Sequence, residues 1–140
     1  MRQILLFALL AASLALLSGC ALSRAKADTA EDMTDKAAYQ KISAEEAYEM
    51  MASQEVVVVD VRAREEYESG HIENAVLVPN ENIGSEMPEA LPDKEATLLI
   101  YCRSGRRSKE AAQKLLSLGY QSVYDFGGVI DWPYELVKEG

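Results

Sequence analysis

The sequence predicts an α/β fold: an open parallel β-sheet flanked by helices on both faces. Two runs, at 56–61 and 97–101, are almost continuously apolar and lack the alternation of a half-exposed strand, which is typical of strands buried on both faces of a parallel sheet. Segments with the spacing of amphipathic helices lie between such runs. Strands that alternate with helices along a chain indicate a parallel sheet with helices packed against it.

The first helix is predicted over 43–53. Ser43 and Glu46 form a capping-box pattern, in which each side chain satisfies a backbone N–H group of the first helical turn. Apolar side chains recur at i, i+3, i+4 and i+7 on one helical face: Ala44, Ala47, Tyr48 and Met51. The buried run 56–61 then forms the first strand.

The middle of the chain is predicted to hold a short helix and two strands. The helix covers 65–69 and ends at Gly70, a residue suited to a helix C-terminus. A short strand follows at 75–79. Residues 80–93 are interrupted by prolines and a glycine, which predicts mostly loop with one helical turn. The run 97–101 is the next buried strand.

The last part of the chain is predicted to contain two helices and one strand. A helix covers 108–118 and stops at Gly119, a strand covers 122–125, and a terminal helix covers 129–137. The apolar positions of the first of these helices are Ala111, Ala112, Leu115 and Leu116. Ligands of such sheets bind at the carboxyl ends of the strands, so the residues that follow 97–101 are the candidate site.

The composition is that of one folded domain with an acidic surface. The chain has 140 residues, of which 49% are hydrophobic, and this is enough for a single core. Its formal net charge is -9. This charge argues against nucleic acid as a partner, because affinity for phosphate backbones comes mainly from clustered lysines and arginines. We expect the domain to act as a monomer.

Residues 1–19 have the pattern of a bacterial signal peptide. A basic start precedes an apolar core at 4–17, which is shorter than the roughly 20 residues that a membrane span needs. The sequence LSGC at 17–20 resembles the lipobox of lipoprotein signals, in which the chain is cut before the cysteine and lipid is attached to its sulfur. The alternatives are an ordinary secretion signal and an uncleaved anchor.

The chain is therefore expected to have three parts. The signal peptide is followed by a lipidated cysteine and a flexible tether at 20–40, which are rich in alanine and charge, and by the folded domain at 41–140. We expect an exported lipoprotein of the cell envelope, held to a membrane through Cys20 and facing the periplasm or the cell exterior. The choice between inner and outer membrane is left open.

Positive charge is concentrated next to the second cysteine, Cys102. The stretch 100–108, IYCRSGRRS, places three arginines directly after it in an acidic chain. If Cys20 carries lipid, Cys102 is the only free thiol and cannot form an intrachain disulfide. The arginines and the N-terminus of the following helix both stabilise an anion, so we expect this thiol to be mostly ionised at neutral pH.

A thiolate among arginines suits two reactions. One is attack on a phosphate ester, and the other is attack on the outer sulfur of a thiosulfate-like donor. The size of the loop discriminates between them. A cysteine phosphatase needs five residues between its cysteine and its arginine, which would place that arginine at Ser108. Here four residues separate Cys102 from Arg107, which is a tighter loop.

Three motifs, in the right order, resemble the rhodanese family of sulfurtransferases. Residues 56–79, VVVVDVRAREEYESGHIENAVLVP, look like the family's D-V-R, E-Y and G-H-I segment. The stretch 102–108, CRSGRRS, looks like its six-residue active-site loop, here 102–107, followed by a serine. The Phe-Gly-Gly sequence at 126–128 with Trp132 looks like its carboxyl-terminal signature. The resemblance covers the chain from about 42 to 137 and implies the rhodanese-like form of the parallel sheet.

The resemblance implies a two-step sulfur transfer through Cys102. The thiolate takes the sulfane sulfur of a donor such as thiosulfate, sulfite leaves, and the persulfide passes its outer sulfur to cyanide or to a thiol. Backbone N–H groups of the loop would hold the persulfide, and the arginines would receive the anionic donor. The substrate-binding residues implied besides the cysteine are Arg103, Ser104, Gly105, Arg106 and Arg107. No metal and no organic cofactor is expected.

Other polar or aromatic residues of these motifs have simpler interpretations. Asp60 and Arg62, at the end of the first buried strand, are expected to be ion-paired or hydrogen-bonded in a structural role rather than to contact substrate. His71 is expected to bond local backbone groups in a turn rather than to activate the thiol. Trp132 is expected to pack in the core rather than to cover the substrate. Asn74 stands where the family often has glycine, and we expect only a local effect on a turn.

Two further interpretations of the function stay open. One is a binding or persulfide-presenting module without appreciable turnover, against which the intact cysteine loop argues. The other is a cysteine phosphatase or arsenate reductase, which the loop size disfavours. For Cys102 itself, the simpler alternative is an inert core cysteine at the end of a strand.

Overall fold

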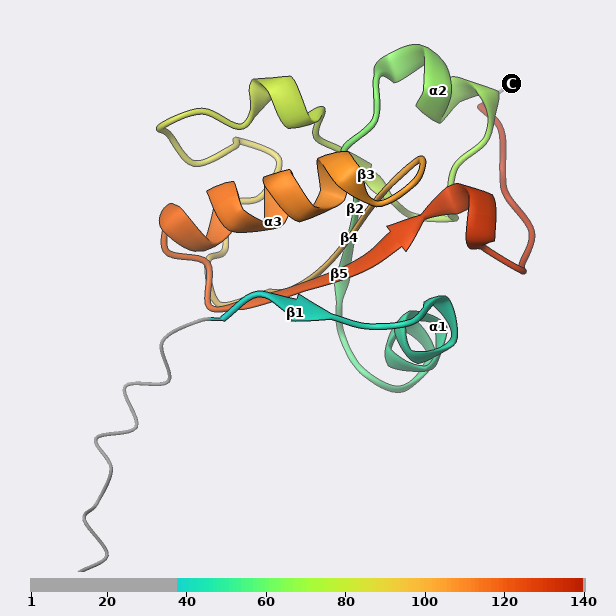
Figure 1. Ribbon diagram of the computed structural model, residues 1–140, viewed down its shortest axis with the longest axis horizontal. Coiled ribbons are helices and arrows are strands. Elements are labelled where there is room, and N and C mark those ends of the chain that lie inside the picture. Colours follow the sequence, from blue (N-terminus) through green and yellow to red (C-terminus); the bar gives the residue numbers. More distant parts are fainter. Residues whose placement is uncertain (1–37, 140) are drawn as a thin grey trace, which may run out of the picture. The chain divides into compact units, whose positions relative to one another are not determined.

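The structure is a computed structural model and describes residues 38–139. It contains a five-stranded parallel sheet with the strand order β1-β5-β4-β2-β3 (Figure 1). The strands are β1 Gln40–Lys41, β2 Val57–Asp60, β3 Val76–Leu77, β4 Thr97–Cys102 and β5 Ser122–Gly128. The helices are α1 Ala44–Ser53, α2 Arg64–Ser69 and α3 Arg106–Ser117, with single 3-10 turns at Asn80–Asn82 and Val129–Asp131. The open parallel α/β sheet predicted from the sequence is confirmed.

The amino-terminal features predicted from the sequence lie outside this description. They are the signal peptide, Cys20 and the tether as far as residue 37. Within residues 38–139, none of the helices has the length and apolar character needed to cross a membrane.

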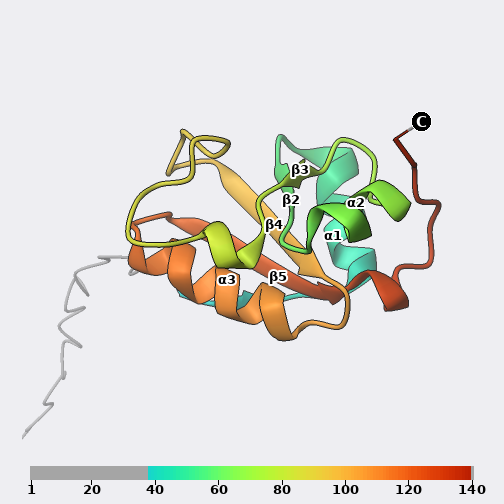
Figure 2. The ribbon, with the colours of Figure 1, turned by 90° about the horizontal axis from the view of Figure 1, so that it is seen from above.

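The sheet separates two hydrophobic cores, because successive side chains of a strand point to opposite faces. On β4, Leu98, Ile100 and Cys102 belong to the core that α3 covers. Leu99 and Tyr101 belong to the core on the side of α1. Figure 1 shows α3 and α1 on opposite sides of the sheet, and Figure 2 shows α3 running along β5. The prediction of helices on both faces is therefore confirmed.

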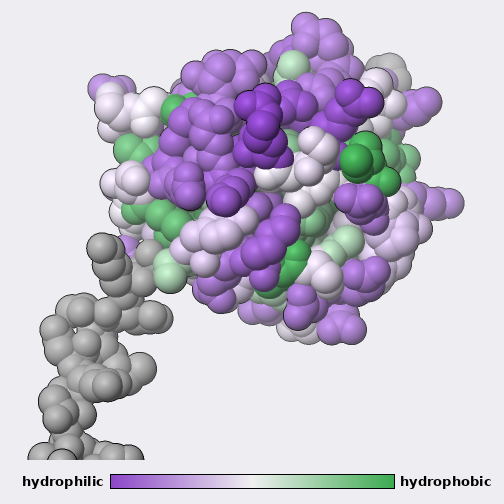
Figure 3. All heavy atoms as spheres, in the orientation of Figure 1, coloured by the Kyte–Doolittle hydropathy of each residue, from purple (hydrophilic) through white to green (hydrophobic). Residues whose placement is uncertain are grey.

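The helix α3 has one buried and one exposed side, as its sequence spacing predicted. Ala111, Ala112 and Leu115 are fully buried against the sheet. The surface over α3 in Figure 3 is mainly hydrophilic. The amphipathic pattern thus fixes which side of α3 meets the sheet, and with it the direction in which the preceding loop approaches the strand ends.

The start of α1 is as predicted. The Ser43 hydroxyl accepts a hydrogen bond from the Glu46 N–H at 3.1 Å, and the Glu46 carboxylate accepts one from the Ser43 N–H at 2.7 Å. The helix buries Ala47 completely and ends at Ser53. The predicted turn in the loop 80–93 is also present, as the 3-10 turn at its start.

The first strand was not predicted, and the domain begins earlier than residue 41. Gln40 and Lys41 form β1 at the edge of the sheet, where both side chains are exposed and carry no apolar pattern. Tyr39 packs against the α3 core, and its hydroxyl donates a 2.6 Å hydrogen bond to the buried carboxylate of Asp125. Lys41 Nζ lies 3.4 Å from the same carboxylate. The predicted tether therefore ends before residue 39.

The predicted terminal helix over 129–137 is wrong. After the 3-10 turn Val129–Asp131 the chain continues without helix, and Val137 forms an antiparallel bridge with His71. The N–H of each of these two residues donates to the carbonyl of the other, at 2.8 and 2.9 Å. These backbone bonds to a distant segment replace the helical ones. Pro133 also lacks the N–H that a helix interior needs.

The strand β5 extends three residues beyond its predicted end and contains a bulge. Its pairing with β4 shifts between Asp125 and Gly127, so that Phe126 has no direct partner. Gly127 adopts a φ of 91°, and its N–H donates to Asp125 Oδ1 at 2.9 Å. The bulge places Gly128 beside Cys102 as its partner across the sheet. The two glycines thus belong to the end of the strand.

Gly128 lets the loop after β4 lie directly against β5. A Cβ atom at this position would clash with the carbonyl oxygen of Arg103 and would lie 2.6 Å from the Cα atom of Ser104. Both are backbone atoms, which cannot rotate away as a flexible side chain can. The close approach of two backbones therefore requires glycine here.

Replacement of Gly128 by alanine is expected to destabilise the protein by about 1–3 kcal/mol, because the added methyl group forces the loop away from the strand. Gly84→Ala is the matched control, since nothing lies within 4 Å of a Cβ at that position. The measurement is urea unfolding of both variants and the unaltered protein. Equal midpoints for the two variants would contradict the close approach.

Candidate active site

Cys102 ends β4 at the carboxyl edge of the sheet and lies beneath the loop that leads into α3. Its side chain is 1% exposed. Its Sγ atom accepts a hydrogen bond from the N–H of Gly105 at 3.1 Å and lies 3.6 Å from the hydroxyl oxygen of Ser108. The sulfur is therefore surrounded by polar groups of the loop and of the first turn of α3.

The backbone of the loop is shaped to place these groups around the sulfur. Gly105 precedes the first helical residue and adopts a φ of 97°, a left-handed conformation that favours glycine. The Ile130 N–H donates to the carbonyl of Arg103 at 3.2 Å, which fixes the start of the loop to the turn after β5. The N-terminus of α3 then points its free N–H groups toward the end of β4.

This environment favours the thiolate of Cys102. Burial raises the pKa of the thiol, but hydrogen bonds from the Ser108 backbone and hydroxyl, and from the N–H groups of Gly105 and Ser104, lower it by more. The net result is a pKa below the usual value of a cysteine. An inert core cysteine has no such set of donors, and burial would leave its pKa high.

Ser108 is a site residue that the sequence analysis missed. The sequence indicated a helix start at position 108 and showed that a phosphatase would need arginine there, but it gave the serine no role in the site. The structure buries Ser108 completely, with its hydroxyl oxygen 3.1 Å from the Gly105 carbonyl and 3.3 Å from the Gly127 carbonyl. The available signal was its position: Ser108 is a polar residue in the first turn of a helix, on the side that later buries Ala111 and Leu115.

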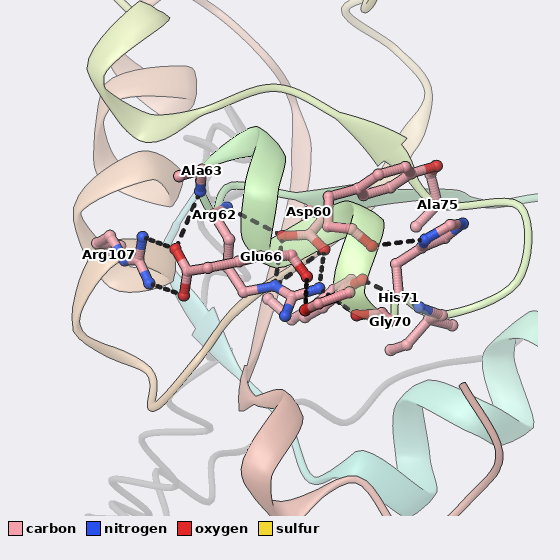
Figure 4. Close-up of polar contacts among 12 residues, drawn as sticks. Asp60, Arg62, Ala63, Glu66, Gly70, His71, Ala75 and Arg107 are labelled. Atoms are coloured by element: carbon pink, nitrogen blue, oxygen red, sulfur yellow. Dashed lines mark hydrogen bonds and ion pairs between the residues drawn. The ribbon is translucent and has the colours of Figure 1, made fainter. Parts of the chain in front are cut away.

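The three arginines of the loop do not have equivalent surroundings. Arg103 and Arg106 are exposed. Arg107 is half-buried and forms a bidentate ion pair with Glu66 of α2, with N–O distances of 2.7 and 2.8 Å (Figure 4). Glu66 was not among the predicted site residues, because 41 positions separate it from Arg107 and only the fold brings the two together.

The expected ion pair of Asp60 and Arg62 is present and holds α2 in place. Asp60 is fully buried and Arg62 is 4% exposed. The Arg62 Nη2 group lies 2.6 Å from Asp60 Oδ2 and also donates to the Gly70 carbonyl at 2.8 Å (Figure 4). Since Gly70 directly follows α2, this pair ties the helix that carries Glu66 to the end of β2.

His71 has the structural role that the sequence predicted. Its Nδ1 atom is 2.9 Å from the Tyr67 carbonyl, and its ring stacks on the Tyr67 ring with a centroid distance of 3.6 Å. In the described part of the chain, no hydrogen bond joins His71 to Cys102. The imidazole is therefore not positioned to take a proton from the thiol.

Trp132 packs against the core on the α1 side, as expected for a core residue. Its ring lies 5.6 Å from that of Phe126, the bulge residue of β5, measured between centroids. Asn74 has a φ of 63°, the left-handed conformation that explains why glycine suits this turn. Within residues 38–139, no group of three histidine, cysteine, aspartate or glutamate side chains could hold a metal ion.

Known proteins are similar to this chain in sequence and in fold. The family model described as the Rhodanese-like domain matches residues 43–133. Curated relatives include tRNA uridine(34) hydroxylases of Hamiltonella defensa, 36% identical over 116 residues, and of Yersinia pestis, 32% identical over 104 residues. These matches cover 78% and 71% of this chain but 33% and 29% of the relatives. The chain thus spans about a third of the length of these curated relatives.

Solved structures with the same fold include a bacterial and a human protein. A rhodanese with anions from E. coli has a TM-score of 0.56 and 33% identity, over 61% of this chain and 100% of that one. A human single-domain sulfurtransferase has a TM-score of 0.60 and 28% identity, over 66% of this chain and 93% of that one. The family model covers more than half of the sequence, and the structures agree with it: the chain belongs to the rhodanese-like domain family.

Proposed function

We propose that this protein is a sulfurtransferase that moves a sulfane sulfur through a persulfide on Cys102. The observation that carries the proposal is the environment of the Cys102 thiol at the start of α3. Its Sγ atom accepts a hydrogen bond from the Gly105 N–H at 3.1 Å, and the surrounding hydrogen bonds lower the pKa of the thiol. A thiolate held in this way is a ready nucleophile and needs no separate base.

The first step transfers sulfur from an anionic donor such as thiosulfate. The Cys102 thiolate attacks the outer sulfur, a new S–S bond forms, and the S–S bond of the donor breaks. Sulfite leaves with the electron pair of that bond, and the outer sulfur of the new persulfide carries the negative charge. The N–H groups that stabilise the thiolate are placed to stabilise this anion as well.

The second step returns the enzyme to its starting state. Cyanide or a thiolate attacks the outer sulfur of the persulfide, and the bond between the two sulfurs breaks. The electron pair of that bond stays on Cys102, which becomes a thiolate again, and the product is thiocyanate or a new persulfide. The two steps balance without an external oxidant or reductant.

Family membership and the size of the loop support sulfur transfer over phosphate chemistry. Structural neighbours include a protein named as a sulfurtransferase and a rhodanese solved with anions. Position 108, where a phosphatase would have its arginine, holds a serine that is fully buried against the thiol. The name of the hydroxylase relatives supports the domain only, because this chain spans about a third of their length.

We also propose that the protein is exported and lipidated on Cys20, from the lipobox pattern at 17–20. A lipid anchor followed by a tether would hold the sulfurtransferase domain close to a membrane surface. The acceptor is then a thiol or cyanide that reaches the outside of the cytoplasmic membrane.

Incubation with thiosulfate is expected to add the mass of one sulfur atom to the protein, and subsequent cyanide is expected to remove it. Intact-mass spectrometry measures both changes, and Cys102→Ser is the control that should show neither. A mass that stays constant in the unaltered protein would overturn the sulfurtransferase proposal. A persulfide that forms but is not discharged by cyanide or thiols would favour the persulfide-presenting module.

Alkylation of Cys102 by iodoacetamide is expected to be half-maximal well below pH 8.5, the usual pKa of a cysteine, because only the thiolate reacts. Ser108→Ala removes the hydroxyl that lies 3.6 Å from Sγ and helps to lower the pKa of Cys102, so its midpoint is expected at higher pH. Ser117→Ala, on the exposed side of α3, is the control. If Ser108→Ala and the control have the same pH profile, Ser108 does not contribute to the ionisation of Cys102.

Cys20→Ala is expected to prevent membrane attachment or to block processing of the signal peptide. Fractionation of cells that produce the full chain measures the membrane-bound share, with Cys102→Ala as a control that keeps the lipobox intact. Unchanged membrane attachment of Cys20→Ala would contradict lipidation.

A further inference from the structure

Arg107 is engaged by a partner inside the protein, whereas the other two loop arginines are not. Two nitrogens of Arg107 bond the two carboxylate oxygens of Glu66 in a bidentate pair. Among the ion pairs of residues 38–139, none involves Arg103 or Arg106. Glu110, one helical turn after Arg106, is paired with Lys114 instead, at 3.0 Å.

The Glu66 carboxylate is a fixed and permanently charged partner. Hydrogen bonds from Arg107, together with the N–H of Ala63 at 3.1 Å, hold the pKa of Glu66 at about 2 against the effect of burial. The helix that carries Glu66 is tied to β2 through the bond from Arg62 to the Gly70 carbonyl (Figure 4). Glu66 is therefore ionised at any pH at which the protein works.

The pair lies close enough to the thiol for its charges to matter there. Arg107 stands in the first turn of α3, directly before Ser108, whose hydroxyl oxygen lies 3.6 Å from the Sγ atom of Cys102. In agreement with this placement, the negative charge of Cys102 contributes to the raised pKa of Arg107. The first partner of Arg107 is nevertheless Glu66, whose hydrogen bonds are the largest cause of that raised pKa. Seen from an anion at the loop, Arg107 and Glu66 together are nearly neutral.

We infer that Glu66 determines the affinity of the site for anionic donors by withdrawing Arg107 from donor binding. Arg103 and Arg106 then form the donor-binding pair, and Arg107 holds the loop to α2. This inference rests on the proposed function for the identity of the donor. The three arginines thus have different roles, which their spacing in the sequence does not distinguish.

The test measures anion binding without turnover. Sulfate has the tetrahedral shape and double negative charge of thiosulfate but lacks the outer sulfane sulfur that thiosulfate donates. Its affinity is read as the concentration that halves the rate of Cys102 alkylation by iodoacetamide, relative to the same variant without sulfate and at constant ionic strength. Each variant is first checked for folding by circular dichroism and thermal unfolding.

Glu66→Gln is expected to tighten sulfate protection about threefold, because it removes a negative charge beside the loop. Glutamine keeps an oxygen that accepts the Ala63 N–H, so the start of α2 is retained. Glu65→Gln, an exposed change of the same charge on the same helix, is the matched control and is expected to leave protection unchanged. Weaker protection in Glu66→Gln than in the control would overturn the inference.

The decisive variant is the double replacement of Glu66 and Arg107 by glutamine. Arg107→Gln alone is expected to weaken protection about threefold, because it leaves the Glu66 carboxylate without its partner. The double variant removes both charges, so its sulfate protection is expected within twofold of that of the unaltered protein. If Arg107 bound the anion directly, the double variant would bind sulfate more than twofold more weakly than the unaltered protein, and the inference would be wrong.

Arg103→Gln and Arg106→Gln form an independent arm that does not disturb α2. Both side chains are exposed, and each variant is expected to weaken sulfate protection about threefold. Unchanged protection in both would overturn the assignment of these arginines.

The sulfate readout separates this inference from the proposed function. If the persulfide forms but sulfate protects the double variant only weakly, the inference is refuted and the proposed function is not. If all variants show the expected sulfate protection but no persulfide forms, sulfur transfer is refuted and the inference is not.

Discussion

The site depends on the close approach of the loop after β4 to the end of β5. The absence of a side chain at Gly128 lets the backbone of Arg103 and Ser104 lie directly on the strand. From there the chain turns through the left-handed Gly105 into α3, so that the first N–H groups of the helix surround Cys102. A wider path would move these donors away from the sulfur, and burial alone would then raise the pKa of the thiol.

A buried carboxylate supports this approach from the other side of β5. Asp125 binds the N–H of Gly127 and thereby holds the bulge that brings Gly128 beside Cys102. Its second oxygen accepts a hydrogen bond from the Tyr39 hydroxyl and lies near Lys41, so β1 and the residue before it provide partners for a carboxylate that would otherwise be costly to bury. The short and exposed β1 therefore has a specific role in the architecture of the site.

Two ion pairs in series connect β2, the neighbour of β4 on the side away from β5, to the same loop. The buried pair of Asp60 and Arg62 fixes the end of α2, and Glu66 on that helix binds Arg107 at the start of α3. One chain of contacts therefore sets both the position of the loop and its charge. The pairing explains why the cationic site of a protein with a formal net charge of -9 is less positive than its arginine count indicates.

Local spacing and local hydrogen bonds are enough to predict the parallel sheet, the capping of α1, the amphipathic α3 and the position of Cys102 after a buried strand. The capping box of Ser43 and Glu46 needs only neighbours in the chain. Four other features could be seen only in the folded protein: the strand β1, the path of the chain to Val137, the burial of Ser108 and the pairing of Glu66 with Arg107. Each of these depends on atoms brought together from distant parts of the chain, and no local pattern specifies such distances.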